Sequence, residues 1–325
     1  MTGAMVIHAP GQPEVMRWED TDIGPPCAGE ARVRHTAIGV NYLDCYYRSG
    51  SYPPPTLPLI VGKEAAGVVE DVAEDVTSVS VGDRVVYATG EIGAYVEERN
   101  IPIEHLIPLP DDINEVTAAA ATLKGLTAEF LVFRSRDILP GDVVLVHAAA
   151  GGVGLILSQW LKHLGAKVIG TVSTDAKAEL ARSSGCDHAV IYTRENVVSR
   201  VKEFTDGEGV SIVFDSVGKD TFFSSLDCLR PLGLMICFGQ SSGPVPSFNM
   251  RELLTRQGLF LTRASMDIHA SSRTRRMEMA THLFDAIRSG AVTIQINQTY
   301  DLNEAAQAHR DLEARRTTGS SILLV

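Results

Sequence analysis

A glycine-rich turn near the middle of the chain has residue types and spacing that point directly to chemistry. The apolar run Val144–Val146 leads through His147 into Ala148-Ala-Ala-Gly-Gly-Val-Gly154, and an amphipathic helical pattern follows. Gly151 would let the backbone approach a phosphate, and Gly154 would let the helix pack closely on the strand. A helix N-terminus also offers N–H groups and a favourable dipole to an anion. The turn therefore predicts a pyrophosphate site. The residues expected to contact a dinucleotide there are Ala149, Gly151, Gly152, Val153 and Gly154.

Ala149 stands where such turns usually have their first glycine, so the motif alone leaves a purely structural turn as an alternative. The surrounding pattern favours the binding interpretation, because strands and helical segments alternate from about Gly125 onwards. Two later strands run into the polar turns Phe214–Gly218 and Cys237–Gly243. Ligands of open α/β sheets bind at these carboxyl ends of the strands. The turns add Ser216, Phe238, Gly239 and Ser241 to the predicted cofactor site.

The end of the second strand of this alternating region indicates which dinucleotide binds. An acidic residue there would bind the ribose hydroxyls and repel a 2′-phosphate, but the sequence has Thr171-Val-Ser-Thr174. Lys177 follows one helical turn later, and Tyr192 ends the next strand. We interpret the nearby Asp175 as a helix N-cap. The sequence therefore predicts NADPH. Ser173, Thr174, Lys177 and Tyr192 are expected around its 2′-phosphate.

The composition limits the kinds of partner. The chain has 29 Lys and Arg against 40 Asp and Glu, which gives a net charge of −11 and disfavours nucleic acid or an anionic membrane as the primary partner. We expect no apolar run of membrane-spanning length and no signal peptide, and hence a cytoplasmic protein. The five cysteines are scattered without a CxxC pair, which favours neither disulfides nor a structural zinc site.

The positions of the expected elements suggest two domains. The first third contains short, valine-rich β-segments typical of a barrel-like β domain, with the proline-rich stretch Ser51–Pro58 as a site lid or a simple connector. The alternating strands and helices that follow predict a doubly wound parallel sheet. After about Ala264, a helix at Arg275–Ser289 and a terminal strand at Ser321–Val325 suggest a return to the first domain.

Seven segments in order make the chain resemble the quinone oxidoreductase and ζ-crystallin family, in the zinc-free branch of the medium-chain dehydrogenase/reductase superfamily. These segments are Gly39–Asp44, Pro58–Gly67, Val81–Val85, Leu123–Thr127, Ala148–Gly154, Phe214–Gly218 and Gly319–Leu323.

The resemblance implies an α/β protein in which a Rossmann domain, residues 126–264, is inserted in a GroES-like catalytic domain, residues 1–125 and 265–325. It implies NADPH-dependent reduction of quinones. The alternatives are reduction of activated alkenes such as enals and enones, or an RNA-binding or structural ζ-crystallin-like role. It also implies a homodimer paired through the Rossmann domains, and we place the pairing edge at Leu234–Phe238.

The resemblance also implies a catalytic pocket around the nicotinamide, with Thr127 and Arg315 contacting the cofactor. Zinc-dependent relatives have Cys and His where this chain has Asn41 and Lys63, so we expect no metal. Hydrogen-bond donors would then polarise the acceptor. Lys63 would either orient Asp44 or the ribose, or pair with Glu64, and each pocket tyrosine would either act on the acceptor or only pack. The expected catalytic residues are Asn41, Asp44, Tyr46, Tyr52 and Lys63.

Overall fold

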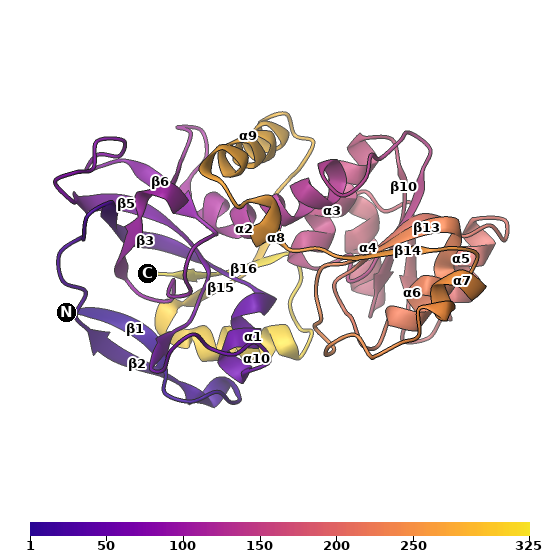
Figure 1. Cartoon of the computed structure of the whole chain (residues 1–325), viewed down its shortest axis with the longest axis horizontal. Helices are drawn as coiled ribbons and strands as arrows, with labels where there is room; N and C mark the ends of the chain where they lie inside the picture. Colours follow the sequence, from indigo (N-terminus) through magenta and orange to yellow (C-terminus); the bar gives the residue numbers. More distant parts are fainter. The chain divides into compact units, whose positions relative to one another are not determined.

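The computed structural model describes all 325 residues, which form two compact units (Figure 1). The first unit contains residues 1–124, 270–284 and 294–325, and the second contains residues 125–269 and 285–293. These limits differ from the expected ones at residues 125, 265–269 and 285–293. The backbone N–H and C=O of Thr293 bond to the side-chain amide of Gln159, at 2.9 and 3.1 Å, which explains why this segment belongs to the second unit.

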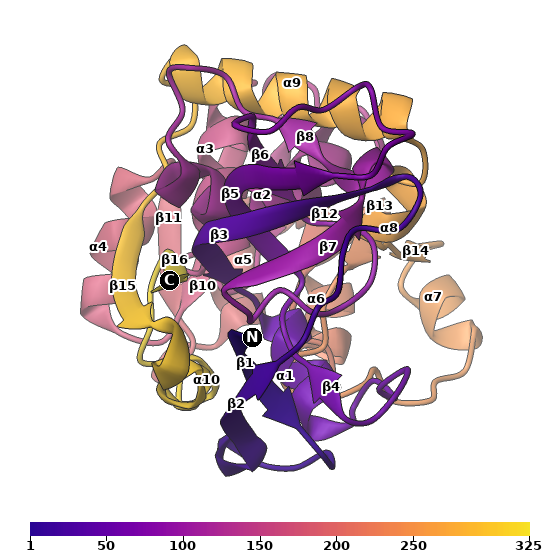
Figure 2. The ribbon, with the colours of Figure 1, turned by 90° about the vertical axis from the view of Figure 1, so that its left-hand side faces the viewer.

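The first unit contains two sheets, and the larger one includes strands from both ends of the chain (Figure 2). The larger has the order β15-β16-β3-β5-β6-β8, with β7 also paired to β3, and the smaller has the order β2-β1-β4. The terminal strand β16 pairs with β3 from Ser321 opposite Val40 to Leu324 opposite Ala37. The predicted return of the C-terminal segment to a β-rich domain is therefore confirmed. The strands are β1 (Thr2–Ile7), β2 (Met16–Thr21), β3 (Glu30–Val40), β4 (Leu59–Ile60), β5 (Glu64–Val72), β6 (Arg84–Tyr87), β7 (Glu98–Pro102), β8 (Ile107–Pro108), β15 (Ile296–Asp301) and β16 (Ser320–Leu324).

Helix α1 (Tyr42–Ser49) follows β3 directly, and α10 (Ala305–Glu313) lies between β15 and β16 in the chain. Alternating side chains of β3 and β5 supply an aliphatic core that includes Val33, Ile38 and Val69, all fully buried. Short 3-10 turns occur at Pro13–Val15, Ile103–His105 and Leu302–Glu304.

The second unit is a doubly wound parallel sheet with the order β11-β10-β9-β12-β13-β14, as predicted. Its central strands are rich in valine and isoleucine and almost wholly buried, which is typical of strands covered by helices on both faces. The strands are β9 (Val143–Val146), β10 (Lys167–Val172), β11 (His188–Ile191), β12 (Val210–Asp215), β13 (Leu229–Cys237) and β14 (Phe260–Arg263). The helices are α3 (Gly152–His163), α4 (Asp175–Ser183), α5 (Val197–Phe204), α6 (Phe222–Cys228), α7 (Arg251–Thr255) and α8 (Met266–His269).

The edge of this sheet differs from the prediction. β13 lies between β12 and β14, so Leu234–Cys237 belongs to an interior strand, and β14 forms the edge. The sequence prediction ended the sheet one strand too early, because the short segment Phe260–Arg263 contains two polar residues and lacks a strong strand pattern.

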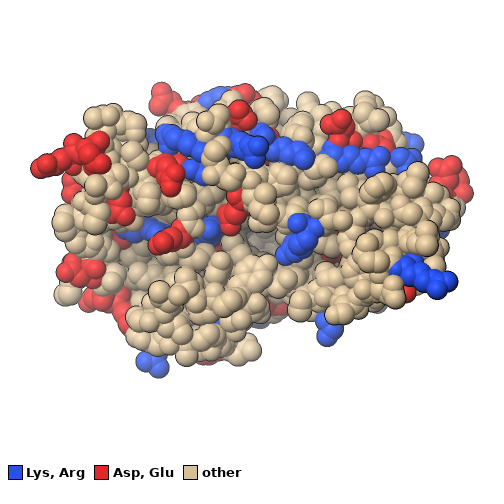
Figure 3. Space-filling view, viewed as in Figure 1, with Lys and Arg blue, Asp and Glu red and all other residues tan.

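Two helices cross the limits between the units: α2 (Glu115–Phe133) and α9 (Arg273–Arg288). By length and composition alone, α2 is long and apolar enough to span a membrane. Its most apolar 18-residue window is 78% buried inside the protein, as in the core helix of a soluble protein. Figure 3 shows lysine and arginine side chains in a row over α9. Two α9 residues, Arg273 and Arg276, donate hydrogen bonds to backbone carbonyls of residues 103–106.

Candidate functional site

The glycine turn leads from β9 into α3. Gly151 is the N-cap of α3 and has an extended backbone, and no side chain caps the helix, so its first N–H groups are available to an anion. A Cβ atom on Gly154 would lie 2.4 Å from the carbonyl oxygen of Ala148 and 2.8 Å from Cα of Ala149. Close packing of α3 on the turn therefore requires glycine at position 154. A Cβ on Gly151 would meet only the Ala148 oxygen, at 3.2 Å.

The N-cap of α4 differs from the prediction by one residue. Thr174 is the N-cap, and its hydroxyl accepts a hydrogen bond from the Lys177 backbone N–H at 3.3 Å. The prediction that Asp175 caps the helix is wrong, because its carboxylate instead pairs with the guanidinium of Arg194 (2.8 Å from Nη1 to Oδ2). This hydrogen bond lowers the pKa of Asp175. Arg194 thus compensates the negative charge beside the predicted 2′-phosphate site.

The later turns at the strand ends are held together by backbone contacts. The backbone N–H of Phe238 donates to the Asp215 carbonyl at 2.9 Å, and that of Ser241 donates to the Ser216 carbonyl at 3.2 Å. A Cβ on Gly239 would lie 2.4 Å from the Ser216 oxygen. The predicted residues Ser216, Phe238, Gly239 and Ser241 therefore form one ledge at the carboxyl ends of β12 and β13.

The side chain of Asp215 holds the backbone of this ledge in place through hydrogen bonds. Its carboxylate accepts hydrogen bonds from the backbone N–H groups of Val217 and Gly218 and from the hydroxyls of Thr221 and Ser225, at 2.7–2.9 Å. Every donor belongs to the turn or to the start of the following helix, so Asp215 has a structural role in shaping this turn.

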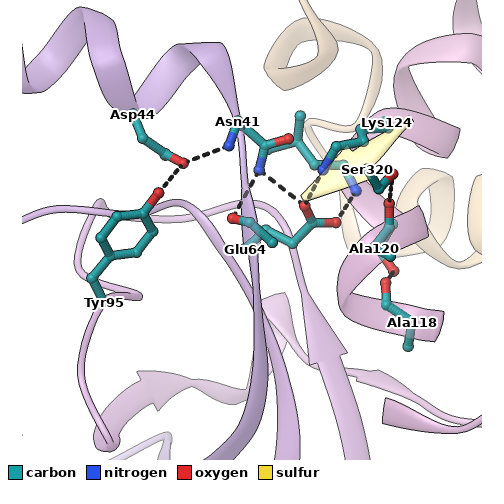
Figure 4. Close-up of polar contacts among 11 residues, drawn as sticks. Asn41, Asp44, Glu64, Tyr95, Ala118, Ala120, Lys124 and Ser320 are labelled. Atoms are coloured by element: carbon teal, nitrogen blue, oxygen red, sulfur yellow. Dashed lines mark hydrogen bonds and ion pairs between the residues drawn. The ribbon is translucent and has the colours of Figure 1, made fainter. Parts of the chain in front are cut away.

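The first unit contains a buried polar cluster behind the start of α1 (Figure 4). The Glu64 carboxylate accepts hydrogen bonds from the Asn41 side-chain amide at 2.9 Å and from the Leu123 backbone N–H, and it pairs with Lys124 at 3.4 Å. The ammonium group of Lys63 donates to the Gly90 carbonyl. The cation in this ion pair with Glu64 is therefore Lys124, a residue that the sequence analysis did not select.

Asp44 lies in the first turn of α1 and has no exposed surface. Its Oδ2 accepts hydrogen bonds from the Asn41 backbone N–H at 2.8 Å and from the Tyr95 hydroxyl at 3.0 Å, whereas Oδ1 has no partner in the protein. Burial raises the pKa of Asp44 to about 7, although both hydrogen bonds and the charge of Lys124 oppose the rise.

The predicted pocket tyrosines pack together. Tyr46 is buried, and its ring centroid lies 5.0 Å from that of Tyr52 and 5.3 Å from that of Tyr42. The backbone N–H of Tyr52 donates to the Tyr46 carbonyl at 3.0 Å. Among the predicted cofactor residues, Thr127 lies on α2 in the second unit, and Arg315 lies in the first unit, exposed just after α10.

The donor groups present do not fit a zinc ion. Cys45 has one imidazole beside it, with 3.5 Å between Cys45 Sγ and His309 Nδ1. A catalytic zinc needs about three protein ligands. No group of three or more His, Cys, Asp and Glu side chains in the structure could hold a metal ion.

Comparisons with known proteins agree over the whole chain. Family models described as "Alcohol dehydrogenase GroES-like domain" and "Zinc-binding dehydrogenase" match residues 27–142 and 152–283. A quinone oxidoreductase of Pseudomonas aeruginosa is 48% identical over 324 residues and covers 100% of both chains. A 2-haloacrylate reductase of a Burkholderia species is 44% identical, covering 100% of this chain and 99% of its own. The crystal structure of Escherichia coli quinone oxidoreductase complexed with NADPH superposes with a TM-score of 0.97 at 43% identity, covering 99% of this chain and 100% of its own.

Proposed function

Because this chain belongs to the quinone oxidoreductase family, we propose that it is an NADPH-dependent enzyme that reduces quinones without zinc. The observation that carries the proposal is the full-length match, with a TM-score of 0.97, to a relative whose structure contains NADPH. The glycine turn and the ledge after β12 and β13 provide the backbone groups that such a cofactor needs.

NADPH, when bound, supplies the hydride for the reduction. We assign its pyrophosphate to the turn at Ala149–Gly154 and its 2′-phosphate to the group formed by Ser173, Thr174, Lys177 and Tyr192. Ser216, Phe238, Gly239 and Ser241 would line the cofactor along the ledge, with Thr127 and Arg315 as further contacts.

Lys177 should determine the preference for NADPH. We expect Lys177→Ala to raise the Kd for NADPH about 10-fold, because a charge-assisted contact with the 2′-phosphate is lost, and to leave the Kd for NADH unchanged. Titration calorimetry measures both constants. The control is Lys162→Ala, which removes an exposed lysine paired with Asp187. Equal effects of Lys177→Ala on the two cofactors would contradict the assignment.

The acceptor carbonyl would be polarised by hydrogen-bond donors of the first unit. Tyr46 and Tyr52 are the candidate donors, and their adjacent rings also offer an aromatic surface to a flat quinone. We expect at least one of Tyr46→Phe and Tyr52→Phe to lower kcat for quinone reduction about 100-fold, within the range for loss of a general acid. Stopped-flow measurement of NADPH oxidation tests this. A small loss of kcat in both variants would contradict the proposal that one of these tyrosines is the hydrogen-bond donor.

An acceptor panel tests the proposed function itself. NADPH oxidation would be followed with 1,4-benzoquinone, 9,10-phenanthrenequinone, 2-alkenals and 2-chloroacrylate. The second candidate, reduction of activated alkenes, is favoured by the 44% identity to a 2-haloacrylate reductase. Turnover of quinones with higher kcat/KM than alkenes supports the main proposal. Turnover of alkenes alone would replace it with the second candidate.

We also propose a cytoplasmic homodimer that pairs along β14. This strand has an unpaired edge, and Phe260 at its start and Leu232 in the neighbouring strand β13 are 58% and 65% exposed. Unpaired strand edges with exposed apolar residues are ready for pairing with a second chain. Sedimentation equilibrium of the wild type and of Phe260→Lys tests the proposal. A monomeric wild type at micromolar concentration would exclude it.

A further inference from the structure

Helix α1 is attached to α10 by two polar links one helical turn apart, although about 260 residues separate the two helices in sequence. The thiol of Cys45 lies 3.5 Å from Nδ1 of His309, and the guanidinium of Arg48 pairs with Glu313. Arg48 also donates to the Gly11 carbonyl at 2.8 Å. The helices lie beside each other in the first unit (Figure 1).

Tyr95 adds a second route from His309 to α1. Its hydroxyl donates to Oδ2 of Asp44 at 3.0 Å and lies 3.0 Å from Nε2 of His309, and its ring meets the imidazole edge-on. Cys45, His309, Tyr95 and Asp44 are each at most 1% exposed. Bulk water therefore cannot replace a hydrogen bond that is lost from this hydrogen-bonded series of four residues.

In the hydrogen-bonded series Cys45–His309–Tyr95–Asp44, each residue donates to the next. Since the Tyr95 hydroxyl donates to Asp44, its oxygen accepts from His309, whose proton must then lie on Nε2. Burial lowers the pKa of His309 to about 3, so the ring is neutral, and Nδ1 is left to accept from the Cys45 thiol. Burial also raises the pKa of Cys45, which keeps the thiol protonated as a donor. Each hydrogen bond of the series thus has one assigned donor and one assigned acceptor.

We propose that Tyr95 and His309 are positioning residues that fix helix α1 and, through it, the candidate catalytic Tyr46. Tyr46 directly follows Cys45 on this helix, and its carbonyl accepts the backbone N–H of Tyr52. Displacing α1 would therefore move both pocket tyrosines. His309 and Tyr95 are fully buried and bond to Cys45 and Asp44 of α1, so we assign them a role through α1 and no contact with the acceptor. The inference rests on the proposed function for its effect on turnover, but its structural part stands independently.

A matched pair of tyrosine variants separates positioning from general stabilisation. Tyr95→Phe removes the hydroxyl between Asp44 and His309. Tyr87→Phe is the control, since Tyr87 is also fully buried and its hydroxyl lies 3.0 Å from Nε2 of another buried histidine, His35. Both variants should lose stability, because each removes a buried hydroxyl and leaves one buried imidazole nitrogen without its partner. We expect only Tyr95→Phe to lower kcat for quinone reduction, by about 10-fold, since small displacements of reacting groups are costly. The Kd for NADPH should not change.

Hydrogen exchange of the α1 amides, measured by mass spectrometry, provides a readout independent of activity. Faster exchange in Tyr95→Phe and His309→Gln, with no change in Tyr87→Phe, is the expected result. Unchanged α1 exchange, or an equal loss of kcat in the two phenylalanine variants, would overturn the proposal. If the wild type reduced no quinone, the proposed function would fail, and the exchange experiment alone would decide whether Tyr95 and His309 hold α1.

Discussion

Gly154→Ala should weaken NADPH binding about 100-fold and also lower the thermal stability of the second unit. The added methyl group would lie 2.4 Å from the Ala148 oxygen and 2.8 Å from the Ala149 Cα, and neither backbone atom can move without displacing the turn. Overpacking of this kind costs about 1–3 kcal/mol of folding free energy. The N–H groups of the turn would also leave the positions that suit a pyrophosphate. Calorimetric titration with NADPH and differential scanning calorimetry measure the two effects.

Gly151→Ala is the second variant, and it separates an effect on NADPH binding from an effect on stability. Its methyl group would meet only the Ala148 oxygen, at 3.2 Å, and the backbone there has an ordinary extended conformation. The fold should therefore tolerate alanine with less than about 1 kcal/mol of lost stability. If Gly151 faces the pyrophosphate, NADPH affinity should still fall at least 10-fold. Loss of stability without loss of affinity in both variants would show that the turn is structural only.

The turns that we assign to the cofactor could be predicted from the sequence because their signals are local. The glycine spacing, the following helix and the polar turns after β12 and β13 each occupy a few consecutive residues, and the strand order then brings them to one edge. The N-cap of α4 was misplaced by one residue because both Thr174 and Asp175 are good capping residues, and the sequence did not show that Arg194 pairs with the second.

The hydrogen bonds that hold the candidate catalytic residues in place could not be predicted in the same way. Cys45 and His309 lie 264 positions apart, and Tyr95 reads as one more apolar residue of a β-rich segment. Lys124 belongs to a segment that carried the family resemblance, but only the fold brings its ammonium group to Glu64. Helix α2 was missed because its apolar residues surround the whole helix and leave no amphipathic period.

Asp44→Asn should make the protein more stable than the wild type at pH 8.5, by about 2–4 kcal/mol, and change its stability little at pH 4. Burial raises the pKa of Asp44 from 3.8 to about 7. A carboxyl group with a raised pKa contributes its full stability below the unfolded-state value, and this contribution is lost as the pH rises through the folded-state value. The ionised form is costly because the carboxylate is fully buried and Oδ1 has no partner; the charge of Lys124 outweighs that of the nearby Glu64 but does not outweigh the cost of burial.

An asparagine at position 44 reproduces the neutral carboxyl group, since its amide oxygen can accept from Tyr95 and from the Asn41 backbone as Oδ2 does now. Urea unfolding of both proteins at several pH values between 4 and 9 gives the difference in free energy, in which the other titrating groups largely cancel. The exposed Asp20, replaced by asparagine, is the control and should follow the wild type throughout. Parallel stability curves for Asp44→Asn and the wild type would mean that the carboxylate is satisfied by a partner. The buried hydrogen-bonded series from Cys45 to Asp44 would then end at a charged carboxylate rather than at a neutral carboxyl group.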